Sequence, residues 1–281
     1  MAKTMRRYFA LFVLPTLAAF VVVFLIPFFQ GVYLSFTTFT TVNDATWVGL
    51  SNYVKAFTVN KEFVNALWFT VKFTIVSVLS VNVLGFVMAM LLTRGIRGTN
   101  LFRTVFFMPN LIGGIVLGWI WQMIFNGILA RYEMTLTFNP DFGFWGLVIL
   151  MNWQMIGYMM IIYIAGIQNI PGDLYDAADV DGAGPVRKLC NVTLPMVMPS
   201  ITICTFLTLT NSFKLFDQNL ALTAGAPSKK TAMLALDIYN TFYGRNGWEG
   251  VGQAKAVVFF LLVAGIALVQ LLLTRRKEVD Q

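Results

Sequence analysis

The sequence contains no histidine, only two cysteines and few charged residues. Without histidine it lacks the commonest general base and the commonest metal ligand. Charged residues make up 12% of the 281 residues, whereas a soluble protein carries about 25%. Hydrophobic residues account for 58% and aromatic residues for 15%. Because one water-soluble core could not bury so much apolar surface, the composition indicates a membrane protein.

Motifs of soluble enzymes are absent as well. The chain has neither a GxSxG nucleophile elbow nor a GxxxxGK[ST] phosphate loop, so we expect no catalysis and no ATP binding of that kind by this chain itself. Cys190 and Cys204 are expected to stay reduced at or near the cytoplasmic side. The aspartates around Gly182 fail the calcium-loop spacing, since its first and twelfth positions would be Ala177 and Lys188. We predict no metal and no cofactor in this chain.

Six apolar stretches approach the roughly 20 residues that cross a bilayer. The predicted spans are residues 11–29, 67–92, 101–125, 144–167, 200–222 and 254–274. The first continues past Ala18-Ala19 without a clear cleavage site, so we predict a retained span rather than a signal peptide. Pro109 should kink the third span, where Gly114 and Gly118 are expected to serve ordinary helix packing. The sequence predicts an all-α protein with one transmembrane domain over residues 1–281.

Basic residues divide unevenly between the two sets of loops. One set holds eleven: Lys3, Arg6, Arg7, Arg94, Arg97, Arg103, Arg187, Lys188, Arg275, Arg276 and Lys277. The other holds six: Lys55, Lys61, Arg131, Lys229, Lys230 and Arg245. Because cytoplasmic loops carry the excess of lysine and arginine, both termini and residues 172–195 are predicted to be cytoplasmic. The same bias explains the net charge of +7 without a nucleic-acid partner.

A polar segment interrupts the apolar pattern between the fourth and fifth spans. Asp173 and Asp176 lie in what would be a first helical turn, where carboxylates interact favourably with exposed N–H groups. Ala177 and Ala178 give one face small side chains, and Gly182 is typical of a helix end. The pattern predicts a short cytoplasmic helix that fits a groove on another protein. A surface linker at the membrane is the alternative.

The spacing of this segment resembles the EAA loop of binding-protein-dependent ABC importer permeases. Asp176-Ala177-Ala178 is followed after three residues by Gly182, and after nine more by Val192-Thr193-Leu194-Pro195. The family pattern is EAA, three residues, G, nine residues and I-x-L-P, so aspartate replaces the first glutamate and valine replaces isoleucine. Residues 169–188 and 216–227 are similar to passages of the carbohydrate branch, which includes the larger permease of the maltose transporter. The resemblance covers roughly residues 8–276.

The resemblance implies a type I importer permease fold with six spans and a cytoplasmic coupling helix. It implies that this helix and the segment after it dock into an ATPase subunit through Asp176, Ala177, Ala178, Gly182, Leu194 and Pro195. The implied partners are a second homologous permease subunit, two ATP-binding cassette subunits, an extracytoplasmic sugar-binding protein and membrane lipid. ATP and magnesium would bind to the cassette subunits. The implied location is the cytoplasmic membrane of a bacterium or archaeon.

Candidate substrate residues lie on the predicted fourth and fifth spans. Sugar sites combine aromatic faces with amide and hydroxyl groups, and the candidates are Trp153, Gln154, Tyr158, Asn211, Ser212 and Lys214. Trp153 and Tyr158 match residues that line the sugar pocket of the maltose permease, whereas Gln154 does not. Helix packing is the alternative for each residue. Because aromatic residues rather than basic clusters populate the set, we expect an oligosaccharide as substrate.

Two other functions stay open at this point. An ion-coupled secondary transporter would work without an ATPase but would usually need intramembrane carboxylates, and only Asp217 comes close. Asp217 follows Lys214 on the same helical face, where they could form an ion pair or face a cavity. A membrane-embedded enzyme is disfavoured because acid–base groups are missing. Lys72 and Lys255 are expected to reach the membrane surface with their ammonium groups.

Overall fold

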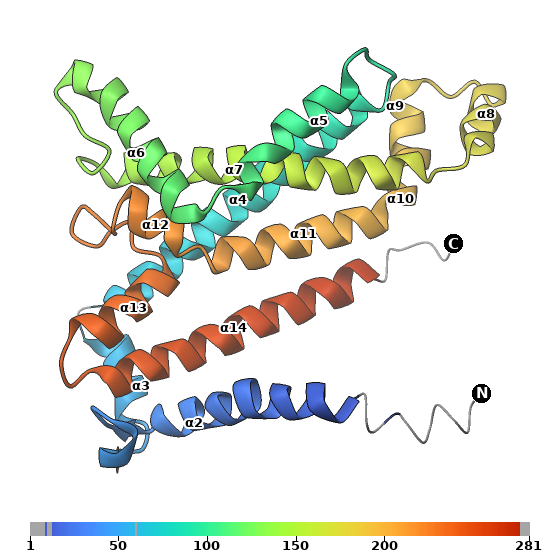
Figure 1. The fold of residues 1–281 in the computed structure, drawn as a ribbon. Coiled ribbons are helices and arrows are strands. Elements are labelled where there is room, and N and C mark those ends of the chain that lie inside the picture. Colours follow the sequence, from blue (N-terminus) through green and yellow to red (C-terminus); the bar gives the residue numbers. More distant parts are fainter. Residues whose placement is uncertain (1–8, 10–12, 60, 276–281) are drawn as a thin grey trace. The chain divides into compact units, whose positions relative to one another are not determined.

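The computed structural model describes residue 9 and residues 13–59 and 61–275, and almost all of its regular structure is helical (Figure 1). The N-terminal elements are η1 (Val21–Leu25), α2 (Ile26–Leu34), β1 (Thr37–Thr38), η2 (Val42–Asp44), β2 (Thr46–Trp47), α3 (Ser51–Thr58) and α4 (Glu62–Leu92). The central elements are α5 (Thr99–Phe107), η3 (Met108–Leu111), α6 (Gly114–Leu129), η4 (Ala130–Tyr132), α7 (Pro140–Gln168) and α8 (Gly172–Val180). The last elements are α9 (Pro185–Lys188), η5 (Leu189–Thr193), α10 (Leu194–Met196), α11 (Met198–Phe213), α12 (Asp217–Leu222), α13 (Leu234–Gly244) and α14 (Glu249–Arg275).

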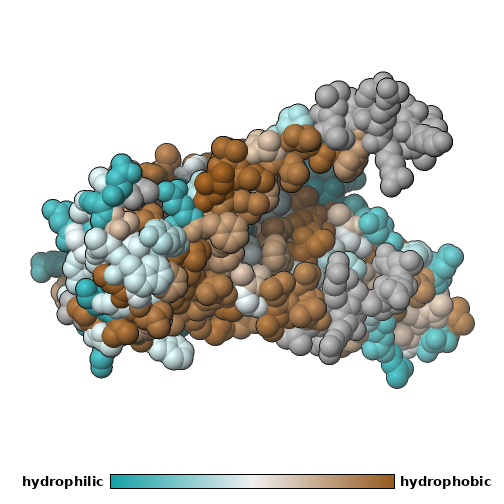
Figure 2. Space-filling model, turned by 90° about the horizontal axis from the view of Figure 1, so that it is seen from below, coloured by the Kyte–Doolittle hydropathy of each residue, from teal (hydrophilic) through white to brown (hydrophobic). Residues whose placement is uncertain are grey.

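Several helices have the length and composition of membrane spans. Five qualify alone: Val13–Leu34, Glu62–Leu92, Gly114–Tyr132, Pro140–Gln168 and Glu249–Leu272. A sixth forms if the bent pair Pro185–Met196 and Met198–Phe213, which meet at 69°, counts as one span. On the face in Figure 2, hydrophobic residues cover much of the middle of the surface. The mostly helical class with several membrane spans is confirmed. Lys3, Arg6, Arg7, Leu11, Arg276 and Lys277 lie outside the described residues, and the orientation stays a prediction.

The third span differs from the predicted kinked helix over residues 101–125. α5 ends at Phe107, and η3, which contains the buried Pro109, follows it. Gly113 is extended, with φ −61° and ψ 141°, before α6 begins. Pro109 removes one backbone donor and Gly113 leaves the helical region, so the chain breaks where a kink was expected. The prediction of one continuous span is therefore wrong.

The fifth span is also shorter than predicted. Residues 200–222 were expected to form one helix, but α11 ends at Phe213 and α12 begins at Asp217. Apolar residues continue across the break at Leu215 and Phe216. Hydropathy alone therefore cannot reveal that the chain turns here.

The chain divides into two compact units, residues 1–63 with 238–260 and residues 64–237 with 261–281. In the second unit α7 is the central helix, with Met151 and Met159 among its fully buried side chains. Val81 of α4 and Cys204 of α11 belong to the same core. A helix that is apolar on every side is buried by its neighbours, and α7 supplies the frame on which the second unit is built.

Polar side chains join α7 to α4 and α11 inside this core. The Tyr163 hydroxyl donates to Oδ1 of Asn82 at 2.7 Å, and Nδ2 of Asn82 donates to the Thr208 hydroxyl at 3.3 Å. Nδ2 of Asn152 donates to the Ser80 hydroxyl at 2.9 Å. Hydrogen bonds between membrane helices fix their rotation and register. They hold α7 in the orientation that the pocket below requires.

The first unit contains the small sheet, in which Thr37 pairs with Trp47 and Thr38 with Thr46. Asn52 of α3 is 1% exposed and holds this hairpin in place. Its Nδ2 donates to the carbonyl oxygens of Ser35 at 3.0 Å and Thr37 at 2.8 Å. One buried amide therefore satisfies two carbonyl groups that the short sheet leaves unpaired.

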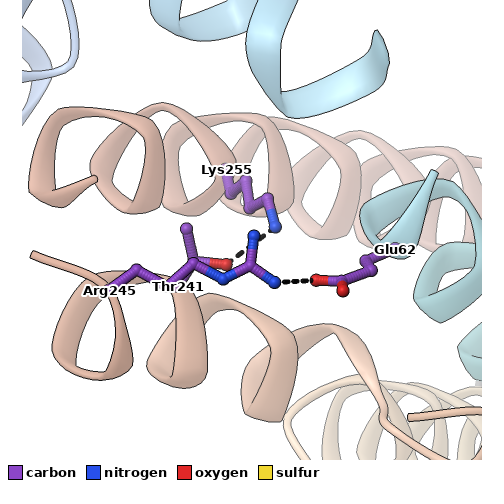
Figure 3. Close-up of polar contacts among 4 residues, drawn as sticks. All are labelled: Glu62, Thr241, Arg245 and Lys255. Carbon is purple, nitrogen blue, oxygen red and sulfur yellow. Dashed lines mark hydrogen bonds and ion pairs between the residues drawn. The ribbon is translucent and has the colours of Figure 1, made fainter. Parts of the chain in front are cut away.

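Charged side chains gather in the same unit (Figure 3). Arg245, just after α13, forms an ion pair with Glu62 at the start of α4. Lys255 of α14 is 3% exposed, and its Nζ donates to the Thr241 hydroxyl at 2.8 Å. The prediction that Lys255 reaches the surface is wrong, because a hydroxyl partner lies within reach inside the unit. Lys72 is exposed, and its Nζ lies 4.6 Å from the centroid of the Phe144 ring. That it reaches the membrane surface stays a prediction.

Candidate functional site

A pocket of about 390 Å³ lies in the second unit, where α7, α12, the end of α11 and the break before α6 come together. Its lining residues are Asn110, Met151, Gln154, Met155, Tyr158, Asn211, Lys214, Leu215 and Gln218. Four carboxamides, one phenol and one ammonium group supply the polar surface, and the lining contains no carboxylate. The volume lies in the range of roughly 300–1,000 Å³ that small-molecule sites occupy. Such a lining suits a ligand with many hydroxyl groups and no positive charge.

Four of the six predicted substrate residues line this pocket. Gln154 and Tyr158 lie one helical turn apart on α7, so they share a face. Asn211 lies near the end of α11, and Lys214 lies directly after it. The structure thus brings together side chains from two separate parts of the sequence. Whether they bind a substrate stays a prediction.

Trp153 and Ser212 do not line the pocket. The α7 residues that line the pocket, Met151, Gln154, Met155 and Tyr158, follow the i, i+3, i+4, i+7 pattern of one helix face. Trp153 falls outside that pattern. Its ring contacts Trp121 of α6 edge-on, with centroids 5.5 Å apart, and 43% of its surface is exposed. Ser212 is fully buried. Helix packing, the alternative to substrate binding, describes the contact of Trp153, whereas the buried Ser212 hydroxyl has no hydrogen-bond partner among the described residues.

Five pocket residues were missed in the sequence: Asn110, Met151, Met155, Leu215 and Gln218. The methionines belong to the same α7 face as Gln154, so helical periodicity could have found them. Asn110, Leu215 and Gln218 lie at or next to helix breaks. The signal was Pro109 for the first break, whereas no residue type marks the second one.

Two glycines of α6 allow α12 to approach it closely and so shape the pocket. A methyl group on Gly118 would come within 2.5 Å of the Ala221 Cβ. A methyl group on Gly114 would come within 2.8 Å of the Asp217 Cβ and 2.9 Å of the Gln218 side chain. These glycines were expected to serve ordinary packing. The contact also sets the position of a pocket residue, Gln218.

Carboxamide groups hold this arrangement together. Nε2 of Gln218 donates to Oε1 of Gln154 at 2.8 Å, and Nε2 of Gln154 donates to the Ile112 carbonyl at 3.5 Å. Outside the pocket, Nε2 of Gln122 donates to the Leu222 carbonyl at 3.0 Å. α12 is thus bound to α7 at its start and to α6 at its end.

Lys214 and Asp217, for which the sequence left an ion pair or a cavity-facing pair open, are both exposed. Among the residues that the structure describes, the two side chains form no ion pair. Only Lys214 lines the pocket. The ammonium group is therefore the one charge on the lining.

The polar segment after α7 folds as predicted into the short helix α8, which lies beyond the end of α7 (Figure 1). Gly182 follows it with φ +68°, a left-handed conformation that glycine adopts without strain. Asp176 and Ala177 are exposed, and Ala178 is half-buried.

Two contacts hold α8 against the segment that follows it. The hydroxyl groups of Tyr175 and Thr193 are hydrogen-bonded at 3.0 Å, and Lys188 forms an ion pair with Asp179. Leu194 and Pro195, which open α10, are half-buried.

The chain matches a protein-family model described as "Binding-protein-dependent transport system inner membrane component" over residues 81–279. The chain belongs to this family. As an importer permease subunit it is a non-catalytic, multi-pass membrane component of a transport system. The family leaves the ion-coupled and enzymatic alternatives without support.

Three relatives match this permease over nearly its whole length. It is 44% identical to the "Probable starch degradation products transport system permease protein AmyD" of Thermoanaerobacterium thermosulfurigenes, over 97% of this chain and 96% of the relative. It is 29% identical to the multiple sugar-binding transport system permease protein MsmF of Streptococcus mutans, with 99% of each covered. It is 28% identical to the trehalose/maltose transport system permease protein MalF of Thermococcus litoralis, over 93% of this chain and 91% of the relative.

Solved structures establish the fold of this permease. A bacterial ABC transporter involved in the import of the acidic polysaccharide alginate matches with a TM-score of 0.81 and 20% identity, over 98% of both chains. The alginate transporter in complex with an alginate pentasaccharide-bound periplasmic protein matches with a TM-score of 0.76, over 98% of this chain and 95% of that chain. The predicted importer permease fold is confirmed.

Proposed function

We propose that this permease is a subunit of an ATP-driven importer that carries an oligosaccharide across the cytoplasmic membrane. The observation that carries the proposal is the pocket, because its carboxamides can both donate to and accept from sugar hydroxyl groups. Sugar transport in the names of the three relatives supports the same substrate class. The relative named for starch degradation products makes α-linked glucose oligosaccharides the first substrates to test.

The pocket divides its tasks between polar and apolar groups. Gln154, Asn211 and Gln218 offer hydrogen bonds to ring hydroxyl groups. The Tyr158 ring and the Met155 side chain offer surface to the C–H faces of the sugar rings. Directional hydrogen bonds fix orientation, while the apolar surface contributes burial without specificity. This combination serves a passing sugar better than a metal ion or a cationic substrate.

Transport also requires coupling to ATP hydrolysis, which we assign to α8. Its exposed Asp176 and Ala177 and its half-buried Ala178 would enter a cleft of an ATP-binding cassette subunit, and the bends at Gly182 and at Leu194-Pro195 would pass the movement to the spans. The complex would contain two such subunits, which bind ATP and magnesium, and a second homologous permease. An extracytoplasmic binding protein would deliver the sugar, and both termini would be cytoplasmic.

Uptake by cells tests the substrate assignment. A strain that lacks this chain is compared with a complemented strain, using labelled maltose, maltotriose and maltotetraose as probes. We expect complementation to restore uptake, and ATP depletion to stop it while dissipation of ion gradients does not. A complemented strain that holds the protein in its membrane but accumulates none of the three sugars would refute the assignment. Uptake that depends only on ion gradients would favour a secondary transporter.

The coupling role of α8 is tested by Ala178→Trp. The bulky ring should keep α8 out of its cleft, so sugar uptake and sugar-stimulated ATPase activity should fall to background while the protein stays in the membrane. Ala130→Trp places the same ring at an exposed position after α6 and should leave both activities unchanged. Full uptake by Ala178→Trp would mean that α8 does not couple.

A further inference from the structure

The side chains of Gln154 and Gln218, which both line the pocket, are hydrogen-bonded to each other. Nε2 of Gln218 lies 2.8 Å from Oε1 of Gln154, and the Gln154 side chain is 8% exposed. The two residues are 64 positions apart and belong to different helices. Their contact depends on the close approach of α12 to α6 at Gly114. The structure therefore holds the two glutamines of the pocket paired to each other.

Paired carboxamides change what a ligand gains on binding. A sugar whose hydroxyl groups take the two atoms used in the pair, Oε1 of Gln154 and Nε2 of Gln218, forms two hydrogen bonds and breaks the one between the glutamines. The net gain is one hydrogen bond, because an existing intramolecular bond is exchanged rather than a solvated group filled. A sugar that binds to two glutamines that are not paired with each other would gain two hydrogen bonds.

We propose that the Gln154–Gln218 pair opens when a sugar enters and closes when it leaves, so that the pocket binds its substrate weakly. The inference rests on the proposed function and concerns the regulation of the same site. A transport pathway needs a site that holds its substrate well enough to admit it and weakly enough to release it. The pair meets both conditions, because the buried Gln154 carboxamide has a partner in Gln218 and a sugar that takes its place displaces a bond.

The exchange also links occupancy to helix position. With the pair closed, α12 is bonded to α7, and Gln154 lies beside the Ile112 carbonyl in the break before α6. When a sugar takes over the glutamines, the direct bond between α7 and α12 is gone. The contacts of α12 with α6 through Gly118 and Gln122 stay in place. Occupancy therefore frees α12 from α7 but not from α6.

A double-substitution cycle tests the pair. The complete importer complex in nanodiscs, without the extracytoplasmic binding protein, is titrated with maltotriose by calorimetry. Gln154→Leu and Gln218→Leu should each change the Kd less than about two-fold, because the remaining glutamine has no partner to give up. The double variant should raise the Kd roughly two- to ten-fold, the effect of one net hydrogen bond. Gln→Met versions of the three variants repeat the cycle if a leucine variant does not assemble.

Gln122→Leu is the matched control, because it removes a carboxamide that bonds to α12 outside the pocket. It should leave the Kd unchanged. If each single variant raises the Kd, and the fold-change of the double variant equals the product of the two single fold-changes, the glutamines act independently. That result would overturn the pair. Equal Kd values throughout, a Gln122→Leu effect as large as the double one, or no binding by a wild-type complex that takes up maltotriose would also overturn it. Absence of oligosaccharide uptake would instead remove the proposed function, and the pair with it.

Discussion

Gly118 is the α6 glycine at which an added methyl group would come nearest to α12, and Gly118→Ala tests how far this contact shapes the protein. The new methyl group would lie 2.5 Å from the Ala221 Cβ, whereas carbon atoms pack best at about 3.5–4.0 Å. The Gln218 carbonyl oxygen and the Leu222 nitrogen, both backbone atoms, would lie at 3.3 Å. A side-chain rotation cannot relieve such contacts, so α12 has to withdraw by about 1 Å or more.

The withdrawal has a cost in stability and a cost in binding. Overpacking of this kind destabilises a protein by about 1–3 kcal/mol, which corresponds to roughly 2–4 °C in Tm per kcal/mol for a protein of this size. Moving α12 also carries Gln218 away from Gln154, which it meets at 2.8 Å. We therefore expect Gly118→Ala to lower the Tm of the purified complex and to change maltotriose binding together with it.

Gly127→Ala is the matched control on the same helix. A methyl group on Gly127 would meet nothing within 4 Å. Alanine is a better helix former than glycine by up to about 1 kcal/mol, so this variant should be as stable as the wild type or more stable. If Gly118→Ala keeps the wild-type Tm, or if both variants shift it equally, the packing argument is refuted.

Two further predictions concern the first unit. Arg245→Ala removes the ion-pair partner that Arg245 gives to the half-buried Glu62 and should lower the unfolding free energy by about 1–3 kcal/mol. Arg245→Lys should have a stability between those of the wild type and Arg245→Ala. Thermal melts measure this, and equal Tm values for the three proteins would contradict it. The Thr40 hydroxyl and the backbone N–H groups of Thr41 and Thr40 hold the pKa of Asp44 below its ordinary value of 3.8. A lowered pKa stabilises the turn above 3.8 and loses that effect as the pH falls through the folded-state value. Amide exchange should show protection of Thr40 and Thr41 falling in acid in the wild type but not in Asp44→Asn.

The mostly helical, multi-pass character followed from composition and hydropathy, whereas the six predicted spans are five, or six if the bent pair counts as one. α4, α7 and α14 lie close to their predicted ranges, because long apolar runs leave the backbone no hydrogen-bonding partner except itself. The break before α6 was only half foreseen. Pro109 signalled a distortion, but a kink and a complete break have the same local cause and differ in what the following residues contact.

The pocket residues also separate into those that the sequence could predict and those that it could not. Gln154 and Tyr158 could be found together because four residues make about one helical turn. Gln218 could not be found, since it enters the pocket only because the chain turns back after α11 and α12 packs on the glycines of α6. Trp153 was included for its type, although its helical angle directs it to Trp121.

The sequence by itself determined that this is a membrane protein, that it is mostly helical and that the short helix α8 forms. The spacing from Asp176 to Pro195 also indicated its family. These are local properties, set by transfer free energies, backbone hydrogen bonding and fixed spacings. The tertiary structure decided which carboxamides meet, that Lys255 is buried beside Thr241, and that α12 is a separate helix. Such contacts join residues far apart in the chain, and their energies depend on close packing that appears only when the helices are assembled.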